Sequence, residues 1–278
     1  MESAFWERVV AEGHKVPDDR SLADLTSELT TMLGDTDPRR RDGIAYEVLA
    51  RWVTEGVYDH LLEGLGDGMA TGLLVGIGQR DTDTVFRRSF SALILGECIS
   101  RTNEQHLLRE DTVLRWGDRV AGWLVREQDL RGFVVGKGWA HAVAHGADAL
   151  AALASSEAVR RLELTVLLDV IADRLLAETD QRLVHGEDDR LALAVMAILR
   201  RDLVGLDVVE PRIARLAMHA RPDFTRSGDQ SAVAGNVASF LRALHLQLAL
   251  APRPPAVRSD LLLTLIEQLR AMHPRFLA

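Results

Sequence analysis

The residues with the most chemical potential lie close together after residue 130. Lys137 is one of only two lysines in the chain, and Trp139 follows it two positions later. On a helix that advances about 100° per residue, His141, His145 and Asp148 fall within about 60° of one another and form one polar stripe. Histidine titrates near neutrality and a neighbouring carboxylate can orient its ring, so this stripe has the composition of a general acid–base site.

The environment of this stripe decides what it does. The opposite side of the same helix carries alanines together with Val143 and Leu150, which predicts that this side faces the core. Solvent-facing helix surfaces usually carry Glu, Lys and Arg, so two histidines and an aspartate favour a groove. The alternatives are a polar network at the rim of the core and a zinc site in which Asp148 is a third ligand. No glutamate follows His141, as a hydrolytic metalloprotease motif requires, and we assign no metal.

The tripeptide Gly136-Lys137-Gly138 precedes the expected helix. A lysine beside the free N–H groups of a helix N-terminus would form a generic anion site. The tripeptide is not part of a Walker A loop, because Gly138 stands where that loop requires Ser or Thr. The alternative is a tight turn in which both glycines have positive φ and the lysine is solvated.

A second concentration of polar residues follows Asp81. Apolar residues occur all around the helix expected over 83–100, so Arg87 and Arg88 are predicted to lie on a largely buried element. A buried arginine needs a counter-charge or a cavity. Arg87 is therefore expected either to pair with a carboxylate such as Asp83 or to clamp a carboxylate or phosphate ligand.

The elements that position these residues are helices almost throughout. Apolar residues recur with helical periodicity, alternation with a period of two is nearly absent, and glycines or prolines punctuate the segments. We predict an all-α fold, best described as a HEAT-like α-hairpin solenoid, with an α/α toroid or a closed helical bundle as the alternatives. The expected helices cover residues 22–33, 38–54, 57–76, 83–100, 111–126, 138–154, 157–178, 188–201, 210–220, 229–249 and 256–272.

A run of glycines interrupts the apolar sequence between residues 64 and 78. Each glycine inside a helix costs about 1 kcal/mol relative to alanine, so several in one segment require a reason. We expect close approach of neighbouring helices together with local breaks. A phosphate-binding loop is disfavoured because no strand precedes the run.

Composition excludes several classes of protein. The 278 residues carry 33 basic and 41 acidic side chains, a formal charge of −8, without the basic stripe that nucleic-acid binding requires. The single cysteine, Cys98, lies in an apolar run and excludes an internal disulfide framework. Neither a signal peptide nor an apolar run of membrane-spanning length is evident. We expect one helical domain over 1–278, located in the cytoplasm, with no nucleic-acid or membrane partner.

Two blocks in particular, Thr84–Leu93 and Gly136–Asp148, resemble a bacterial family catalogued only as a domain of unknown function. Shorter similarities lie at Phe5-Trp6, in 22–25 and in 37–49, so the resemblance covers about residues 3–203. The segment 205–278 is more divergent. The resemblance implies a helical protein without an established activity, so it identifies no catalytic residues and no cofactor.

Three functions remain open from the sequence. The first is a binding protein whose polar groove takes a small or peptide-like, anionic ligand. The second is an enzyme in which His141 or His145 is the general base, Asp148 orients it, and Arg87 or Lys137 stabilises negative charge. The third is a protein-interaction scaffold. The groove of the first hypothesis is expected to contain Arg87, Arg88, Lys137, Trp139, His141, His145 and Asp148.

Overall fold

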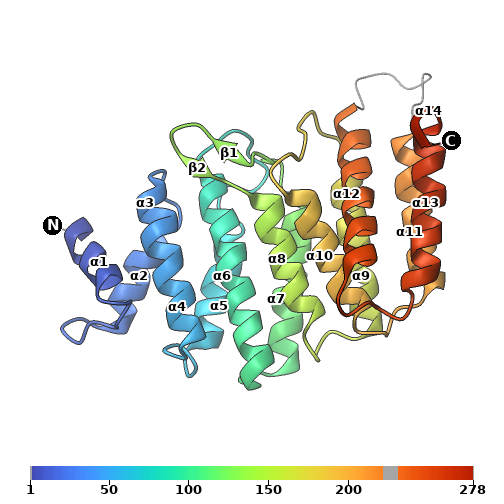
Figure 1. The fold of residues 1–278 in the computed structure, drawn as a ribbon. Coiled ribbons are helices and arrows are strands. Elements are labelled where there is room, and N and C mark those ends of the chain that lie inside the picture. The colour runs from blue at the N-terminus through green and yellow to red at the C-terminus, as the bar shows by residue number, and fades with distance from the viewer. Residues whose placement is uncertain (1, 222–230, 278) are drawn as a thin grey trace. The chain divides into compact units, whose positions relative to one another are not determined.

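The computed structural model describes residues 2–221 and 231–277. The chain divides into two compact units, Met1–Ala149 and Leu150–Ala278, and each buries its own set of aliphatic side chains. Both units are built from α-helices, as the periodicity of the sequence predicts (Figure 1). The strands in the described part of the chain form one two-stranded antiparallel sheet.

The amino-terminal unit contains the helices that carry the sequence-predicted site. A short π-helical segment, η1 (Arg41–Tyr46), joins two of its helices, and a small hairpin precedes its last helix, which continues past the boundary between the units. The elements are α1 (Glu2–Ala11), α2 (Leu22–Met32), α3 (Pro38–Arg40), α4 (Glu47–Thr54), α5 (Leu62–Gly72), α6 (Thr84–Gln105), α7 (Glu110–Arg126), β1 (Phe133–Val134), β2 (Gly138–Trp139) and α8 (Ala142–Ala154).

The carboxy-terminal unit continues with helices of similar length. Its elements are α9 (Arg161–Leu176), α10 (Glu187–Leu199), α11 (Leu206–Ala220), α12 (Ser231–Leu250), α13 (Arg258–Met272) and α14 (Pro274–Leu277). Expected segments such as 188–201 and 256–272 agree with these helices to within a few residues. The expected segment 229–249 begins at residues that lie outside the described part of the chain.

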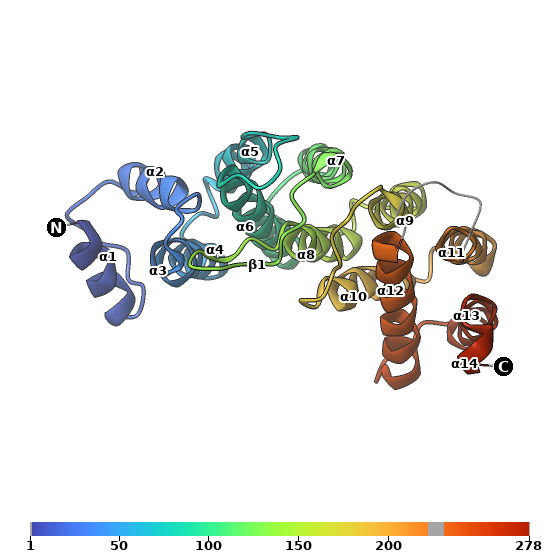
Figure 2. The same ribbon diagram turned by 90° about the horizontal axis from the view of Figure 1, so that it is seen from above.

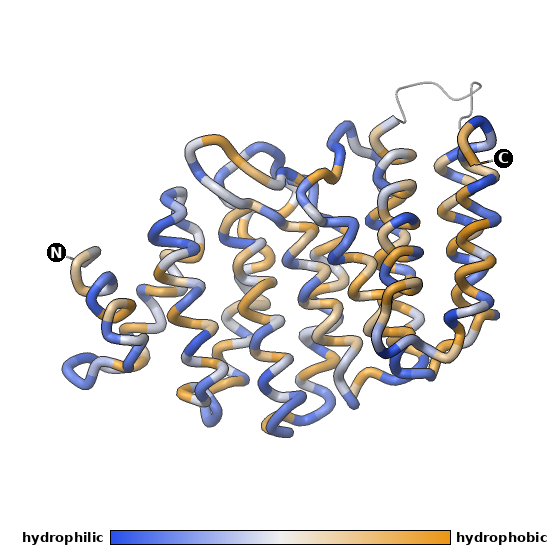
Figure 3. The backbone as a smooth tube through the Cα atoms, in the orientation of Figure 1, coloured by the Kyte–Doolittle hydropathy of each residue, from blue (hydrophilic) through white to orange (hydrophobic). Residues whose placement is uncertain are grey.

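Within each unit, a helix packs against the helix two positions along the chain as well as against its sequence neighbour. In the amino-terminal unit α4 packs on α6 and α5 packs on α7, while in the other unit α9 packs on α11 and α10 on α12. In the amino-terminal unit this places α5 and α7 in one layer and α4, α6 and α8 in the other (Figure 2). Apolar and polar residues alternate along these helices, because each turns one face to its neighbours (Figure 3).

Local sequence signals account for where two of the helices begin. The Ser21 hydroxyl accepts a hydrogen bond from the backbone N–H of Asp24 at 3.1 Å, which caps α2. The Asp37 carboxylate accepts one from the N–H of Arg39 at 3.0 Å, and Pro38 occupies the first helical position. Both helices therefore begin at the first residue of the expected segments 22–33 and 38–54.

The glycine-rich run allows two close helix–helix approaches. A side chain at Gly66 of α5 would overlap the ring of Trp116 on α7, and one at Gly72 would overlap the Ser91 hydroxyl on α6. Farther on, Gly76 and Gly78 have φ of 63° and 84°, so the helix expected over 57–76 ends early. The predicted combination of close packing and local breaks is therefore confirmed.

The hairpin before α8 differs from the sequence-based expectation. A helix was expected from residue 138, but α8 begins at Ala142, and the preceding residues pair as strands, with Val134 opposite Gly138. The physical reason is the backbone of Gly136 and Gly138, whose φ angles of 76° and 78° produce a tight turn. Lys137 is thus part of a hairpin turn and does not lie at a helix N-terminus.

Among the helices of residues 2–221 and 231–277, none combines the length and the apolar composition that a membrane span requires.

The helix α1 is not among the helices expected from the sequence. It adds Trp6 to the core of the amino-terminal unit.

Candidate functional site

The hairpin of β1 and β2 is held on the amino-terminal unit by polar contacts to distant parts of the sequence. Arg41 of η1 donates to the carbonyl oxygen of Lys137 at 2.8 Å, and the Lys137 ammonium lies 2.6 Å from the Asp83 carboxylate at the start of α6. Arg131 donates to the carbonyl oxygen of Thr82 at 2.8 Å. The cation predicted for an anion site at Lys137 is therefore already paired with a carboxylate of the protein.

His145 lies in the core, against α6. It is 5% exposed, and its Nδ1 lies 2.7 Å from the hydroxyl of Ser89, which is fully buried. That hydroxyl also donates to the carbonyl oxygen of Ala140. Because a hydroxyl has one proton, Nδ1 of His145 must carry the proton of the second bond. This polarity is opposite to that of an activated nucleophile, in which the histidine accepts the serine proton.

His141 is the residue immediately before α8, and it has a left-handed backbone with φ of 51°. Its ring stacks on Trp139, with 4.3 Å between the ring centroids and 20° between the planes. It is 8% exposed, whereas Trp139 is 39% exposed and covers it from solvent on that side. The two histidine rings are 5.8 Å apart in an edge-to-face arrangement. Histidines and tryptophan therefore form a packed aromatic group around the start of α8.

Asp148 is half-buried and lies farther along α8. Its negative charge acts on Glu97 of α6, whose pKa is raised first by burial and further by the Asp148 carboxylate. Asp148 thus shares its surroundings with a second acid. In the part of the chain that the structure describes, no three or more His, Cys, Asp and Glu side chains gather in a way that could hold a metal ion, and this includes the predicted His141, His145 and Asp148.

Arg88 is fully buried in an ion pair with Glu127, which follows α7. Its Nε and Nη2 donate to the two carboxylate oxygens at 2.6 and 2.8 Å, and its Nη1 donates to the carbonyl oxygens of Val75 and Gly76 and to the Thr84 hydroxyl. Every donor nitrogen of this guanidinium is bonded to the protein. The contacts connect α6 to the loops after α5 and α7, which is a structural task, and the Arg88 side chain is 0% exposed.

Arg87 does not form the expected ion pair with Asp83. Its Nη1 donates to the carbonyl oxygen of Thr30 in the last turn of α2, where a cation also complements the helix dipole. Asp83 pairs with Lys137 instead, and burial alone lowers the pKa of Arg87. The buried Nε of Arg87 and the buried Ser91 hydroxyl have no hydrogen-bond partner in the described structure, but both pack directly against Gly72.

The structure does not bring the seven predicted side chains into one groove. Arg87 contacts α2 and α5, whereas Ser89, two residues later on α6, faces the histidines on the opposite side of the helix. Arg88 points in a third direction, toward Glu127. Trp139, His141 and His145 do lie together, with Trp139 stacked on His141 and His145 packed against Phe90 and Ser89 of α6.

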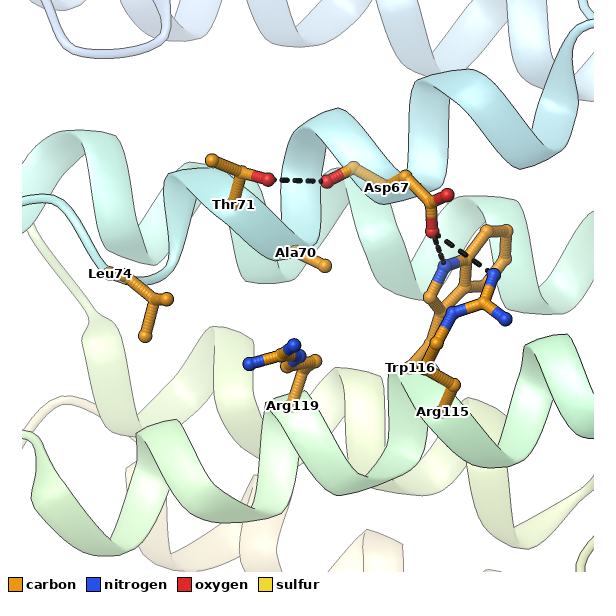
Figure 4. Close-up of a pocket in the computed structure, with 7 residues that line it drawn as sticks. All are labelled: Asp67, Ala70, Thr71, Leu74, Arg115, Trp116 and Arg119. Atoms are coloured by element: carbon orange, nitrogen blue, oxygen red, sulfur yellow. Dashed lines mark hydrogen bonds and ion pairs between the residues drawn. The ribbon is translucent and has the colours of Figure 1, made fainter.

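A pocket of about 320 Å³ lies elsewhere in the same unit, between α5 and α7 (Figure 4). Its α5 side consists of Ala70, Thr71 and the partly exposed Leu74, which follows the helix. Its α7 side carries Arg119. The remaining lining residues, at one end, are Asp67, Arg115 and Trp116.

The charged groups at that end of the pocket are bonded to one another. Trp116 donates its Nε1 proton to Asp67 at 2.8 Å, and Arg115 donates to Asp67 at 3.4 Å and to Glu63 at 3.0 Å. The pKa of Arg115 is raised, first by the hydrogen bond to Glu63 and then by the one to Asp67. Arg119 differs from these groups. In Figure 4 its guanidinium stands beside the pocket without a bond, and no described residue forms a hydrogen bond or ion pair with it.

No pattern in the sequence predicts this pocket. Arg115 and Arg119 stand four residues apart on α7, which places them on one face of the helix, but this spacing is common on solvated surfaces. The informative contact joins Asp67 to Trp116 across 49 positions of sequence. Only the packing of α5 on α7 brings these residues together, so a single sequence holds no local signal for the pocket.

One family model matches the chain. It is described as "Protein of unknown function (DUF2785)" and it matches residues 73–246, which is more than half of the chain. The matched segment includes both distinctive blocks, 84–93 and 136–148, and it also extends beyond residue 205. No curated protein and no solved structure matches the chain.

Proposed function

The chain belongs to this family of unknown function, and from its geometry we propose that it is a helical-repeat binding protein that takes a small anionic ligand in the pocket between α5 and α7. The observation that carries the proposal is Arg119, an arginine that lines a pocket of about 320 Å³ without a hydrogen bond or ion pair to any described residue. A guanidinium offers two parallel donors to a carboxylate or phosphate, so it is suited to anchor such a group.

The architecture we propose is a HEAT-like stack of helical hairpins in a bacterial cytoplasmic protein. The packing of each helix on the helix two positions along supports this description, because stacked hairpins produce that pattern within each of the two units. The single cysteine, Cys98, is buried and free, which suits a reducing compartment. A surface formed by parallel helices, such as α5 and α7, is a common place for a ligand site in helical proteins.

The size and lining of the pocket limit the ligand. Pockets for small molecules begin at about 300 Å³, so this pocket takes a ligand of a few heavy atoms to about a dozen. Ala70 and Leu74 offer apolar contact, while the Thr71 hydroxyl donates its proton to the carbonyl oxygen of Asp67 at 2.9 Å. The ligand class that fits is a short organic acid with its anionic group on Arg119 and its hydrocarbon part along α5.

The enzyme hypothesis has less support in the geometry. His145 and Ser89 are bonded with the polarity that does not activate serine, and Trp139 covers His141. None of these residues lines the pocket between α5 and α7. The scaffold hypothesis requires no ligand in that pocket, and the following experiment separates it from the proposal.

The experiment is a titration of the purified protein with acetate, hexanoate, benzoate and inorganic phosphate, followed by isothermal calorimetry. We expect at least one of these anions to bind, and Arg119→Gln to abolish that binding. The matched control is Arg109→Gln, which removes an equal charge from an exposed arginine at the start of the same helix. Absence of binding by all four anions, or equal binding by Arg119→Gln and the wild type, would overturn the proposal.

A further inference from the structure

The pocket between α5 and α7 has a fixed negative charge as well as a free positive one. Asp67 lines the pocket at the end opposite Leu74, and its Oδ1 accepts hydrogen bonds from both Trp116 and Arg115. Trp116 cannot easily move, because its ring is buried against Gly66, where there is no space for a side chain. Asp67 is therefore held at the pocket wall by a rigid donor.

The second cation of the pocket is neutralised by protein carboxylates. Arg115 is bonded to Glu63 at 3.0 Å and to Asp67 at 3.4 Å, so two negative side chains share its one positive charge. Arg119 remains as the guanidinium that a ligand can use. The pocket thus offers Arg119 as a site for one anionic group. At the end opposite Leu74, the Asp67 carboxylate repels a second anionic group.

Resting on the proposed function, we infer that the pocket selects monoanions, specifically monocarboxylates with a short apolar chain, and that Asp67 is the residue that determines this selectivity. A ligand carboxylate on Arg119 leaves its hydrocarbon chain along Ala70 and Leu74, where burial of CH₂ groups is favourable. A dicarboxylate bound to Arg119 can instead turn its second carboxylate toward the end of the pocket where Arg115 lies, but there it meets Asp67 and is repelled by it. A dicarboxylate can also expose its second group to water, and it then loses the apolar contact.

The alternative within the same site is that Arg115 leaves Asp67 and binds a second ligand carboxylate. The contact of 3.4 Å between Arg115 and Asp67 is the longer of the two bonds that Arg115 makes here. If Arg115 moved in this way, the ligand carboxylate and Asp67 would both lie near a single guanidinium that Glu63 already contacts. Coulomb repulsion between the like charges opposes this arrangement.

The test compares hexanoate with adipate, which has the same number of carbons and a carboxylate at each end. Both carboxyl groups of adipate are ionised at pH 7.5. We expect the wild type to bind hexanoate about tenfold more tightly than adipate by calorimetry, after correction for the two equivalent ends of adipate. In Asp67→Asn, the amide oxygen can still accept the Trp116 proton, and we expect this preference to fall to about twofold or less.

The control is Asp111→Asn, which removes an equal charge from an exposed position of α7 outside the pocket. This variant should keep the wild-type preference. Equal binding of hexanoate and adipate by the wild type, or an unchanged preference in Asp67→Asn, would overturn the inference while the proposed anion site remained. If neither acid binds and the anions of the first titration do not bind either, the proposed function itself fails.

Discussion

The buried ion pair between Arg88 and Glu127 makes the stability of the amino-terminal unit sensitive to one substitution. Both side chains are 0% exposed. Replacing Arg88 with methionine keeps most of the side-chain volume but removes the positive charge. Glu127 is then left with hydrogen bonds from Trp123 at 2.9 Å and from two backbone N–H groups. The carbonyl oxygens of Val75 and Gly76 each lose a donor.

The expected cost follows from the loss of the counter-charge. Removing one partner of a buried ion pair typically destabilises a protein by about 3–5 kcal/mol, because the remaining charge is buried without its counter-charge. For a unit of this size, this corresponds to a decrease in melting temperature of about 6–20 °C. The change should be read from urea unfolding followed by tryptophan fluorescence, because the indole of Trp123 is bonded directly to Glu127.

Three further variants make the measurement decisive: Arg109→Gln, Glu127→Gln alone, and the double variant of Arg88 and Glu127. Arg109→Gln disrupts an ion pair of α7 whose arginine side chain is 84% exposed, and its effect should stay within about 0.5 kcal/mol. The double variant Arg88→Met/Glu127→Gln removes both charges and should cost clearly less than the sum of the two single changes. A loss below about 1 kcal/mol in Arg88→Met, or strict additivity in the double variant, would refute the reasoning.

Two other predictions concern α5 and α6. Burial and the Asp148 carboxylate raise the pKa of Glu97 above its ordinary value of 4.5, so the folded state is disfavoured as pH rises through that value. Glu97→Gln should therefore be more stable than the wild type at pH 7 and lose this advantage below about pH 4, in thermal unfolding series. Asp118→Asn, an exposed carboxylate of α7 that is not among the groups that shift Glu97, is the control, and a pH-independent difference would contradict the assignment. Gly66→Ala should destabilise by about 1–3 kcal/mol because its methyl group would overlap the Trp116 ring. Gly64→Ala, in open space on the same helix, should instead stabilise by up to about 1 kcal/mol; equal effects of the two changes would contradict the packing argument.

The helices could be predicted because their signals are local. The apolar periodicity of α7 and the caps at Ser21 and Asp37 depend on residues within one or two turns of each other. The turn at Gly136 was also visible in the sequence. The hairpin that this turn forms, after which α8 begins, could not be predicted. Two short paired strands have too few residues to show a period of two.

The candidate site could be predicted only in part, because its contacts join distant segments. Spacing alone predicts that the rings of His141 and His145 lie close together, and they are 5.8 Å apart although His141 precedes α8. Spacing does not identify what the His145 ring contacts, which is Ser89, 56 residues earlier. The same limit applies to Arg88, whose neighbour Arg87 points to a different helix although the two are adjacent in sequence. Which partner a buried arginine meets is decided by tertiary packing.

The most direct test of the central claim is a crystal structure of the protein soaked with the tightest-binding anion of the titration. The account predicts density between α5 and α7, with the anionic group about 3 Å from the guanidinium of Arg119 and the hydrocarbon part against Leu74. Density for the anion only at another place, such as beside Lys137 and Trp139, would contradict the account. An empty pocket in crystals of a protein that binds the anion in solution would contradict it equally.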